Sequence, residues 1–246
     1  LLERLSVAYR QMEAFNADVA HELNTPLTTL ISSCELALRK PRSEAELREV
    51  LASNLEDLRR MAGIVADMLF LSQADRGQGA RLAPWASLAA LAHEVIDFHE
   101  AALQEADLQV VVQGDAAAEV DARLLRRALS NLLGNATRYA QRGSTITVQI
   151  GARPCTHHGG AGDVALAVLN RGPAIDPVHL PRLFDRFYRA DAARSQADRN
   201  HGLGLAIVAA IARMHGGRCF AESEGGFTRI GLELPDSPSP PRDSPA

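Results

Sequence analysis

The chain has 246 residues, of which 46% are hydrophobic, and a formal net charge of −4. This length and composition allow one large or two small domains with a real core, and the weakly acidic balance gives no basis for nucleic acid or an anionic membrane as a partner. The 3 cysteines are scattered, which excludes a disulfide framework or a cysteine zinc site and fits a reducing compartment.

The first predicted element is a long helix, because apolar residues return every three or four positions. Its apolar seam consists of Met12, Phe15, Val19, Leu23, Leu27, Leu30 and Cys34. The pattern already runs at Leu1, which is not a methionine, so we expect a fragment of a longer protein. Its apolar runs are too short for a membrane-spanning helix, and no signal peptide is visible.

A second long helix is predicted to begin at Ser43, because Glu46 follows three residues later and the pair forms a capping box. Its seam consists of Leu47, Leu51, Leu55, Leu58, Met61, Val65 and Met68. Two helices with a short connection form an antiparallel hairpin, and one hairpin buries only one thin seam. We therefore expect two copies to pair into a four-helix bundle, which makes the protein a homodimer.

After a polar, linker-like segment the sequence changes character. Helices are predicted over residues 87–106, 121–140 and from the glycines near 202 to Gly216, and strands over 108–112, 144–151, 163–170 and twice within 218–234. Asp121 is the expected N-cap of the second of these helices. The pattern predicts a mixed sheet with helices on one face, followed by a disordered Pro/Ser-rich tail.

The first helix places His21 beside Glu22 and five residues before Pro26. At about 100° per residue, His21 is predicted to face solvent, away from the apolar seam. An exposed imidazole is available as a nucleophile, and Glu22 can take or orient a ring proton. Pro26 is expected to bend the helix, and Thr25 lies one turn on, where its hydroxyl can hold a water. Alone, this pattern also fits an ordinary surface histidine.

The helix over 121–140 carries Asn131 and Asn135, four residues apart on one face. A carboxamide oxygen suits Mg²⁺, which bridges nucleotide phosphates. Arg138 is placed to reach a phosphate, and Tyr139 offers a flat face for a base. A buried helix with polar caps would look the same.

Two glycine-containing turns follow. Asn170 ends a strand and can accept a hydrogen bond from an adenine amino group, and Gly172 lets the backbone approach a ligand. Gly202 and Gly204 open a helix, whose free N–H groups suit a phosphate. The first part of residues 180–200, between these turns, is aromatic and basic. The second part is polar without periodicity, which predicts a mobile lid there.

These motifs together resemble the cytoplasmic kinase core of a bacterial two-component sensor histidine kinase. "HELNTPL" is similar to the phosphoacceptor box and "NLLGNATRY" to the asparagine box. "NRGPAI", "LFDRFYR" and "GLGLAIV" are similar to the first glycine, phenylalanine and second glycine boxes. The resemblance covers residues 1–235.

The resemblance implies a role for each matching residue. His21 accepts the γ-phosphoryl group of ATP, Glu22 is its acid/base partner, and Thr25 serves the reverse, phosphatase reaction. Asn135 is implied as the Mg²⁺ ligand. The implied nucleotide-binding residues are Asn131, Asn135, Arg138, Tyr139, Asn170, Gly172, Ile175, Gly202, Gly204 and Leu205.

The resemblance also implies an organisation. Residues 1–75 would form the dimerising phosphotransfer hairpin, with 1–14 as the end of a membrane-proximal signalling helix, 76–84 a linker, 85–235 an α/β sandwich ATP-binding domain of the gyrase type, and 236–246 a disordered tail. The implied partner is a response regulator receiver domain. The full-length protein would lie at the cytoplasmic side of the bacterial inner membrane, held there by a sensor part absent from this chain, and the fragment would be soluble.

Three residues depart from the family pattern. Asn24 replaces the usual basic residue, Asn170 the usual adenine-binding aspartate, and Ala174 the second glycine of the first glycine box. Alanine disfavours a positive φ, so nucleotide binding is expected to survive but to weaken. The Asn–x–Gly form is also similar to the branch that senses heavy metals.

Two alternatives follow from the same residues. Poor nucleotide binding would leave a dimeric scaffold that binds and dephosphorylates its regulator. An ATP-driven clamp shares the nucleotide fold, but has no use for an exposed His–Glu–x–x–Thr–Pro helix. His93 and His99 are expected on the exposed side of a helix, and "CTHHGG" (155–160) is expected to be a solvated loop rather than a metal site.

Overall fold

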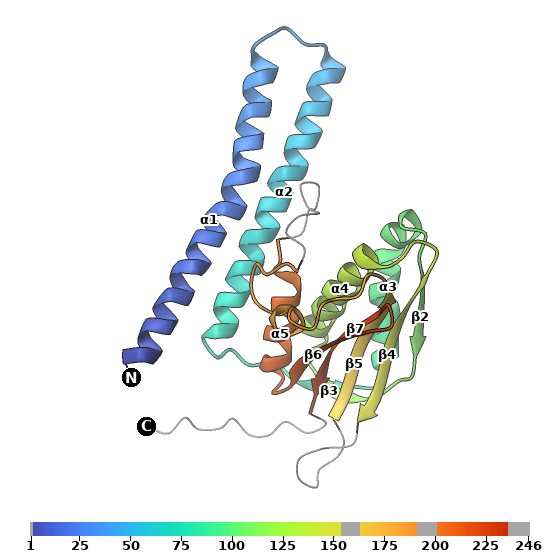
Figure 1. The fold of residues 1–246 in the computed structure, drawn as a ribbon. Coiled ribbons are helices and arrows are strands. Elements are labelled where there is room, and N and C mark those ends of the chain that lie inside the picture. Colours follow the sequence, from blue (N-terminus) through green and yellow to red (C-terminus); the bar gives the residue numbers. More distant parts are fainter. Residues whose placement is uncertain (1, 154–162, 191–200, 236–246) are drawn as a thin grey trace. The chain divides into compact units, whose positions relative to one another are not determined.

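The fold was obtained as a computed structural model that describes the backbone of residues 2–153, 163–190 and 201–235 (Figure 1). Side chains are described over the same ranges except for residues 2–18, 21, 152 and 153. The chain divides into two compact units, Leu1–Phe70 and Leu71–Ala246. The predicted disordered tail and the 155–160 loop lie outside the described residues.

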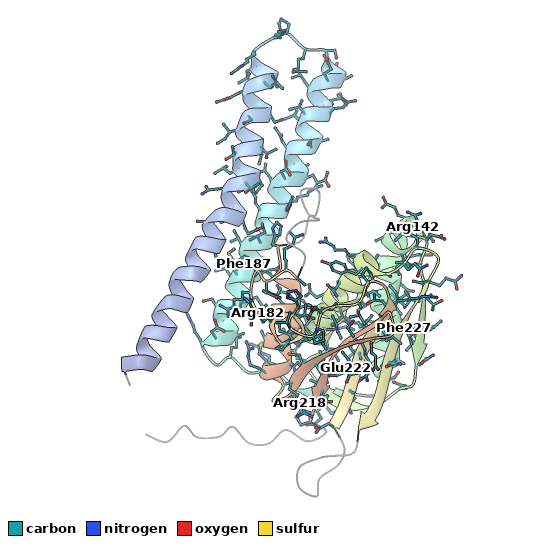
Figure 2. The ribbon with its side chains drawn as sticks, viewed as in Figure 1. Arg142, Arg182, Phe187, Arg218, Glu222 and Phe227 are labelled. Carbon is teal, nitrogen blue, oxygen red and sulfur yellow. The ribbon has the colours of Figure 1, made fainter. Side chains whose placement is uncertain are left out.

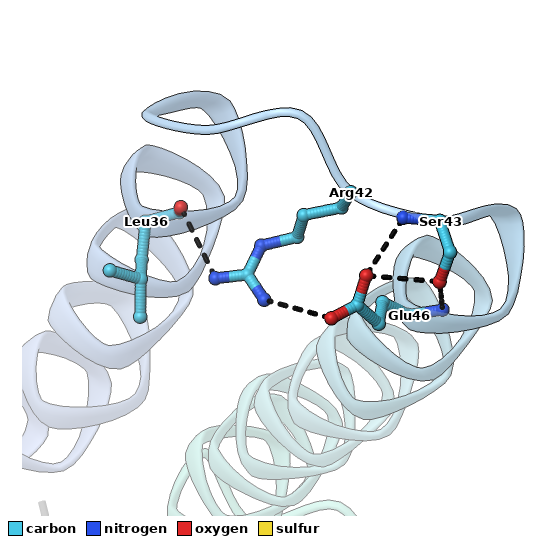
Figure 3. Close-up of polar contacts among 4 residues, drawn as sticks. All are labelled: Leu36, Arg42, Ser43 and Glu46. Atoms are coloured by element: carbon cyan, nitrogen blue, oxygen red, sulfur yellow. Dashed lines mark hydrogen bonds and ion pairs between the residues drawn. The ribbon is translucent and has the colours of Figure 1, made fainter.

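The first unit is a helical hairpin of α1 (Leu2–Leu38) and α2 (Glu44–Asp75). The last turn of α2, from Leu71 onward, belongs to the second unit. The predicted capping box is confirmed (Figure 3): the Ser43 N–H donates to Glu46 Oε2 at 2.7 Å, and the Glu46 N–H donates to Ser43 Oγ at 3.3 Å. Arg42 bridges the two helices, because Nη2 donates to the Leu36 carbonyl at 3.4 Å and Nη1 lies 4.0 Å from Glu46 Oε1. The loop therefore caps both helix ends.

Only part of the predicted seam is buried within the hairpin. Leu30 of that seam is buried, and so is Ile64, which the predicted seam of the second helix did not include. The buried Asn54 amide donates to Cys34 Sγ at 3.2 Å between the two helices. Large apolar side chains remain exposed along both helices: Leu27, Ile31, Leu36, Leu38, Leu47, Leu51, Leu55, Leu58, Val65 and Leu69. A single hairpin thus leaves a long apolar surface in water.

The second unit is a sheet with helices on one face (Figure 1). Its helices are α3 (Leu88–Glu105), α4 (Ala122–Tyr139) and α5 (Gly204–Met214). The five-stranded sheet has the order β2-β4-β5-β7-β6, with β2 (Gln109–Gln113), β4 (Thr145–Arg153), β5 (Asp163–Arg171), β6 (Arg218–Glu224) and β7 (Phe227–Leu234). β2 and β4 pair in parallel and the other neighbours are antiparallel, so the predicted mixed sheet is confirmed.

Alternation along the strands fixes which side chains meet the helices. Ile146, Val148 and Ile150 of β4 are buried, as their two-residue spacing predicts. Asp121 is the N-cap of α4, where its Oδ1 accepts from the Leu124 N–H at 3.1 Å.

None of the described helices has the length and apolar character needed to span a bilayer.

The sequence did not predict a second, two-stranded sheet. β1 (Ala83–Trp85) pairs antiparallel with β3 (Ala118–Val120). Just before β1, the Ala80 N–H donates to the Met214 carbonyl at 3.0 Å and the Arg81 N–H donates to Asp121 Oδ2 at 3.3 Å. The segment that follows α2 is therefore fastened to the ends of α4 and α5.

Candidate functional site

His21 lies within α1, where the phosphoacceptor motif was predicted. The exposure predicted for its side chain lies outside the described residues. Glu22 is half-buried and Thr25 is exposed, and Pro26 is accommodated inside the helix with its ring buried. After Pro26, Thr29 Oγ1 donates to the Thr25 carbonyl at 3.2 Å, a backbone contact that helical threonines commonly make.

Small polar side chains line a groove on α1 beyond His21. The lining residues are Asn24, Thr25, Thr28, Thr29, Ser32, Ser33 and Leu36. Neighbours in this set are one, three or four residues apart, so they lie along one side of the helix over about three turns. The groove is therefore lined mainly by small side chains and lies next to the motif that carries His21.

In the second unit, α4 and the start of α5 bring the asparagine motif and the second glycine motif together. Asn131 and Asn135 are half-buried one turn apart on α4, and the Asn131 amide donates to the Arg127 carbonyl at 3.0 Å. A Cβ on Gly204 would lie only 3.1 Å from Asn131 Oδ1. Glycine at this position therefore allows the asparagine side chain to lie against the first turn of α5.

The N-terminus of α5 has the chemistry of an anion site. Its N-cap, Leu203, is buried and supplies no side-chain hydrogen bond to the first N–H groups. Those N–H groups carry the positive end of the helix dipole. Leu205 is half-buried in this first turn, and Arg138 and Asn135 are half-buried on α4.

The first glycine motif lies against the C-terminal end of α4. A Cβ on Gly172 would lie 2.2 Å from the Tyr139 carbonyl oxygen, a separation that no side chain tolerates. The same Cβ would lie 3.3 Å from Asn170 Nδ2. Glycine is thus required for the turn to pass between the exposed Tyr139 and the buried Asn170.

Ala174 does not impair this turn in the way its sequence suggested. Among the described non-glycine residues, a positive φ is found at Asp107 (57°) and Phe187 (60°), and not at Ala174. The backbone therefore takes a path at this position that an alanine adopts without strain. The Ile175 N–H then donates to Ser223 Oγ at 3.0 Å, which holds the turn to β6.

The structure adds two polar residues that the sequence motifs did not identify. Thr228 is paired with Asn170 in the register of β7 and β5, and Ser223 is paired with Thr228 across β6 and β7. Ser223 Oγ and Thr228 Oγ1 are 3.2 Å apart. Thr228 is 5% exposed, so its hydroxyl belongs to the interior end of the site. The signal available in the sequence was a threonine in register with the inward-facing Ile230 and Leu232 of the same strand.

One backbone contact links Phe187, in the aromatic part before the predicted lid, to Gly202, just after it. The Phe187 N–H donates to the Gly202 carbonyl at 3.1 Å, and Gly202 has a φ of +69°. A Cβ on Gly202 would lie 2.7 Å from the Phe187 carbonyl carbon, so glycine is needed there. Residues 191–200 of the predicted lid lie outside the described residues.

The aromatic part of this segment is held by its own side chains. It begins with a short 3-10 helix, η1 (Leu180–Arg182). The Arg182 guanidinium lies 4.2 Å from the Tyr188 ring centroid, and His179 Nδ1 lies 2.6 Å from the Tyr188 hydroxyl (Figure 2 labels Arg182). Arg186 also pairs with Asp75 at 2.6 Å, which joins this segment to the last turn of α2 within the second unit.

The prediction that His99 lies on the exposed side of its helix was wrong, and a second histidine, His215, is buried. His99 is half-buried, and its Nε2 lies 2.7 Å from Ser130 Oγ on α4. His215 is 4% exposed; its Nδ1–H donates to the Ile211 carbonyl at 2.8 Å, and its Nε2 accepts from the Asp121 N–H at 3.0 Å. The two contacts of His215 require its neutral ring. Burial lowers the pKa of both His99 and His215.

We expect the second unit to lose stability in mild acid. Each folded-state pKa lies below the ordinary histidine pKa of about 6.5, so the unfolded chain binds the protons more readily. The stability contribution is therefore complete above that pH and falls below it. The slope is limited to about 1.4 kcal/mol per pH unit for each histidine. The pH dependence of the free energy of unfolding is measured by urea unfolding at several pH values between about 7.5 and 5.5, followed by the fluorescence of Trp85.

A matched pair of variants separates this effect from general acid sensitivity. His215→Gln is expected to reduce the pH slope, and His93→Gln, whose side chain is exposed on α3, is expected to leave it unchanged. Equal slopes in all three proteins would show that the buried ring is not the origin of the pH dependence.

Comparison with known families gives two matches in chain order. Residues 11–77 match the His Kinase A (phospho-acceptor) domain. Residues 120–238 match the family described as histidine kinase-, DNA gyrase B-, and HSP90-like ATPase. Both of the motif groups described above fall inside these matched segments.

A curated relative extends the match to nearly the whole chain. Sensor histidine kinase CusS of Escherichia coli (strain K12) is 44% identical over 239 residues, which are 96% of this chain and 48% of that protein. The chain therefore spans about half the length of the curated relatives it matches.

Two solved structures share the fold. The Acinetobacter baumannii histidine kinase AdeS has a TM-score of 0.69 at 22% identity and covers 88% of this chain and 98% of its own. Histidine kinase ThkA, in complex with response regulator protein TrrA, has a TM-score of 0.70 at 21% identity and covers 96% of this chain and 64% of its own. The family matches and the relative show that the chain belongs to the sensor histidine kinases.

Proposed function

We propose that this chain autophosphorylates His21 from Mg-ATP and passes the phosphoryl group to an aspartate of a response regulator. The observation that carries the proposal is the meeting of separate motifs at one end of the second unit. Asn131 lies against Gly204, and Gly172 passes against the Tyr139 carbonyl. These contacts join α4, the β5 turn and the first turn of α5 around one place.

The residues there fit a magnesium nucleotide. Asn135 offers a hard amide oxygen for Mg²⁺, and Arg138 offers a guanidinium for a phosphate. The N–H groups at Gly204 and Leu205 suit the phosphate chain, and Gly202 would let the backbone approach it. The base would lie toward Asn170, Gly172 and Ile175. Mg-ATP supplies the phosphoryl group, and the protein supplies position and charge neutralisation.

In the first unit, His21 is the proposed nucleophile. Glu22 would accept or orient a proton on one ring nitrogen, so that the other nitrogen attacks the γ-phosphorus. The bond to the leaving oxygen of ADP breaks as the nitrogen–phosphorus bond forms. This assignment rests on the motif and on the match to the phosphoacceptor domain.

We also propose a homodimer. The exposed leucines of α1 and α2, such as Leu51 at 67% and Leu58 at 52% exposure, form an apolar surface that a soluble monomer rarely keeps in water. A second hairpin would cover this surface and complete a four-helix bundle.

The proposed partner is the receiver domain of a response regulator. The groove lined by Thr25, Thr28 and Ser32 continues along α1 from the phosphoacceptor motif, and the fold neighbour ThkA was solved with a response regulator. We further propose that the longer protein senses a metal and works at the cytoplasmic side of the inner membrane, as its resemblance implies.

Thr25→Ala is expected to retain autophosphorylation and to lose at least about tenfold of the phosphatase rate toward the phosphorylated regulator. The reason is that Thr25, one turn beyond His21, would hold the attacking water but takes no part in the forward reaction. Autophosphorylation and regulator dephosphorylation are measured separately on the same protein.

Ser53→Ala is the matched control, since this exposed hydroxyl lies on α2 and is not among the residues that line the groove. Equal loss of both activities in Thr25→Ala would indicate a structural role for the hydroxyl instead.

The transfer step has a direct test. The chain is labelled with γ-labelled ATP, freed of nucleotide and mixed with a receiver domain. The proposal predicts that label leaves the chain and appears on the receiver as an alkali-labile acyl phosphate. Label that stays on the chain with every candidate receiver, including one from a neighbouring operon, would contradict the assignment as a two-component phosphodonor.

A further inference from the structure

The base end of the nucleotide site is built from three neutral polar side chains in one row. Strand register aligns Asn170 of β5 with Thr228 of β7, and Thr228 with Ser223 of β6. Cross-strand partners share a face, and Val168 and Ile230, two residues away on the same strands, are buried beneath the helices. The row therefore faces the helix layer. In Figure 2 it can be found from the labelled residues Glu222, which precedes Ser223 on β6, and Phe227, which precedes Thr228 on β7.

Each member of this row can both donate and accept a hydrogen bond. Ser223 Oγ accepts from the Ile175 N–H at 3.0 Å and lies 3.2 Å from Thr228 Oγ1, so either hydroxyl can be the donor between them. Asn170 is 4% exposed and carries no charge. Buried polar groups select a ligand by leaving the wrong one unpaired, so the donor and acceptor pattern of this row decides which base fits.

A carboxylate at position 170 would impose one pattern. An ionised aspartate only accepts hydrogen bonds, so it pairs with the 6-amino group of adenine and repels the 6-oxo group of guanine. The Asn170 amide removes this restriction. Its oxygen can accept from a 6-amino group, and after rotation by half a turn its NH₂ group can donate to a 6-oxo group.

The surroundings permit both orientations of the amide. Asn170 Nδ2 lies beside Gly172, where a Cβ would approach to 3.3 Å and crowd it. Thr228, its cross-strand partner, can reverse its own hydrogen bond by rotating the hydroxyl. No charged side chain belongs to the row that would fix one direction.

We propose that Asn170 makes the site tolerant of both 6-amino and 6-oxo purines. Guanosine and inosine nucleotides then bind with affinities similar to those of adenosine nucleotides. The inference rests on the proposed nucleotide function and specifies its substrate class. Guanosine triphosphate would then serve as a phosphoryl donor with the same bonds made and broken, since the base does not take part in the transfer.

Calorimetric titration of the full chain with ADP, GDP and IDP in Mg²⁺ tests the proposal. IDP carries the 6-oxo group without the 2-amino group of guanine, so it isolates the contact with Asn170. We expect IDP and GDP to bind within about tenfold of ADP. In Asn170→Asp, the ratio of the GDP to the ADP dissociation constant is expected to rise by at least about tenfold.

The outcomes separate this inference from the function beneath it. ADP binding with GDP and IDP both weaker by more than about tenfold would overturn purine tolerance and leave the nucleotide site intact. An unchanged ratio in Asn170→Asp would remove Asn170 as its cause. Absence of binding by all three nucleotides would overturn the proposed function itself. The wild-type IDP titration decides the question even if the aspartate variant does not fold.

Discussion

His21→Ala is expected to reduce autophosphorylation to background, at least about a thousandfold below wild type, and to leave Mg-ATP affinity unchanged. The acceptor nitrogen is lost with the side chain. The proposed nucleotide-binding residues are on α4, α5 and the β5 turn, which lie in the other compact unit. Incorporation of label from γ-labelled ATP and a nucleotide titration measure the two properties.

The control for this variant is His93→Ala, which removes another histidine, exposed on α3. It is expected to incorporate label like wild type. Label that persists in His21→Ala would place the acceptor elsewhere. Loss of nucleotide binding in His21→Ala would mean that the two functions are not divided between the units as proposed.

Asn135→Ala is expected to lower Mg-ATP affinity by roughly thirtyfold, which corresponds to about 2 kcal/mol. The amide oxygen is the proposed Mg²⁺ ligand, and a hard cation that loses a ligand replaces it with water at a cost. Most of the loss should appear only in the presence of Mg²⁺. Titrations with and without the metal separate the metal-dependent part from any change in packing.

Asn24→Ala is the matched amide control, because Asn24 is exposed on α1 in the first unit. Its Mg-ATP affinity should equal that of wild type. If Asn135→Ala binds Mg-ATP as tightly as this control, Asn135 is not the metal ligand. If affinity falls equally with and without Mg²⁺, its contribution is to the nucleotide or to the shape of α4.

Local signals in the sequence were sufficient for most of the fold. The Ser43–Glu46 capping box and the Asp121 N-cap are short-range patterns, and both form as predicted. The alternation of Ile146, Val148 and Ile150 predicted the buried face of β4. Such features depend on neighbours a few residues away, so a single sequence is enough to identify them.

Features that depend on distant pairing were missed. β1 and β3 are three residues each and gain their hydrogen bonds only from one another, across a separation that no local pattern reveals. His99 was placed on the exposed side because its contact, Ser130, lies on another helix.

The candidate site shows the same division. Its motifs were found in the sequence, but Thr228 and Ser223 enter only through the register of β5, β7 and β6. Conversely, Ala174 looked unfavourable for nucleotide binding because a glycine was expected, and the backbone there has no positive φ. Side-chain identity alone does not give the path of a turn.

The central claim is that His21 accepts a phosphoryl group from ATP. The most direct measurement is incubation of the chain with γ-labelled ATP and Mg²⁺, followed by exposure of the labelled protein to acid and to alkali. The account predicts label that survives alkali, is lost in acid and is absent from His21→Ala, as expected for phosphohistidine. A folded chain that binds ATP but takes up no label, or takes up label that is stable to acid, would contradict it.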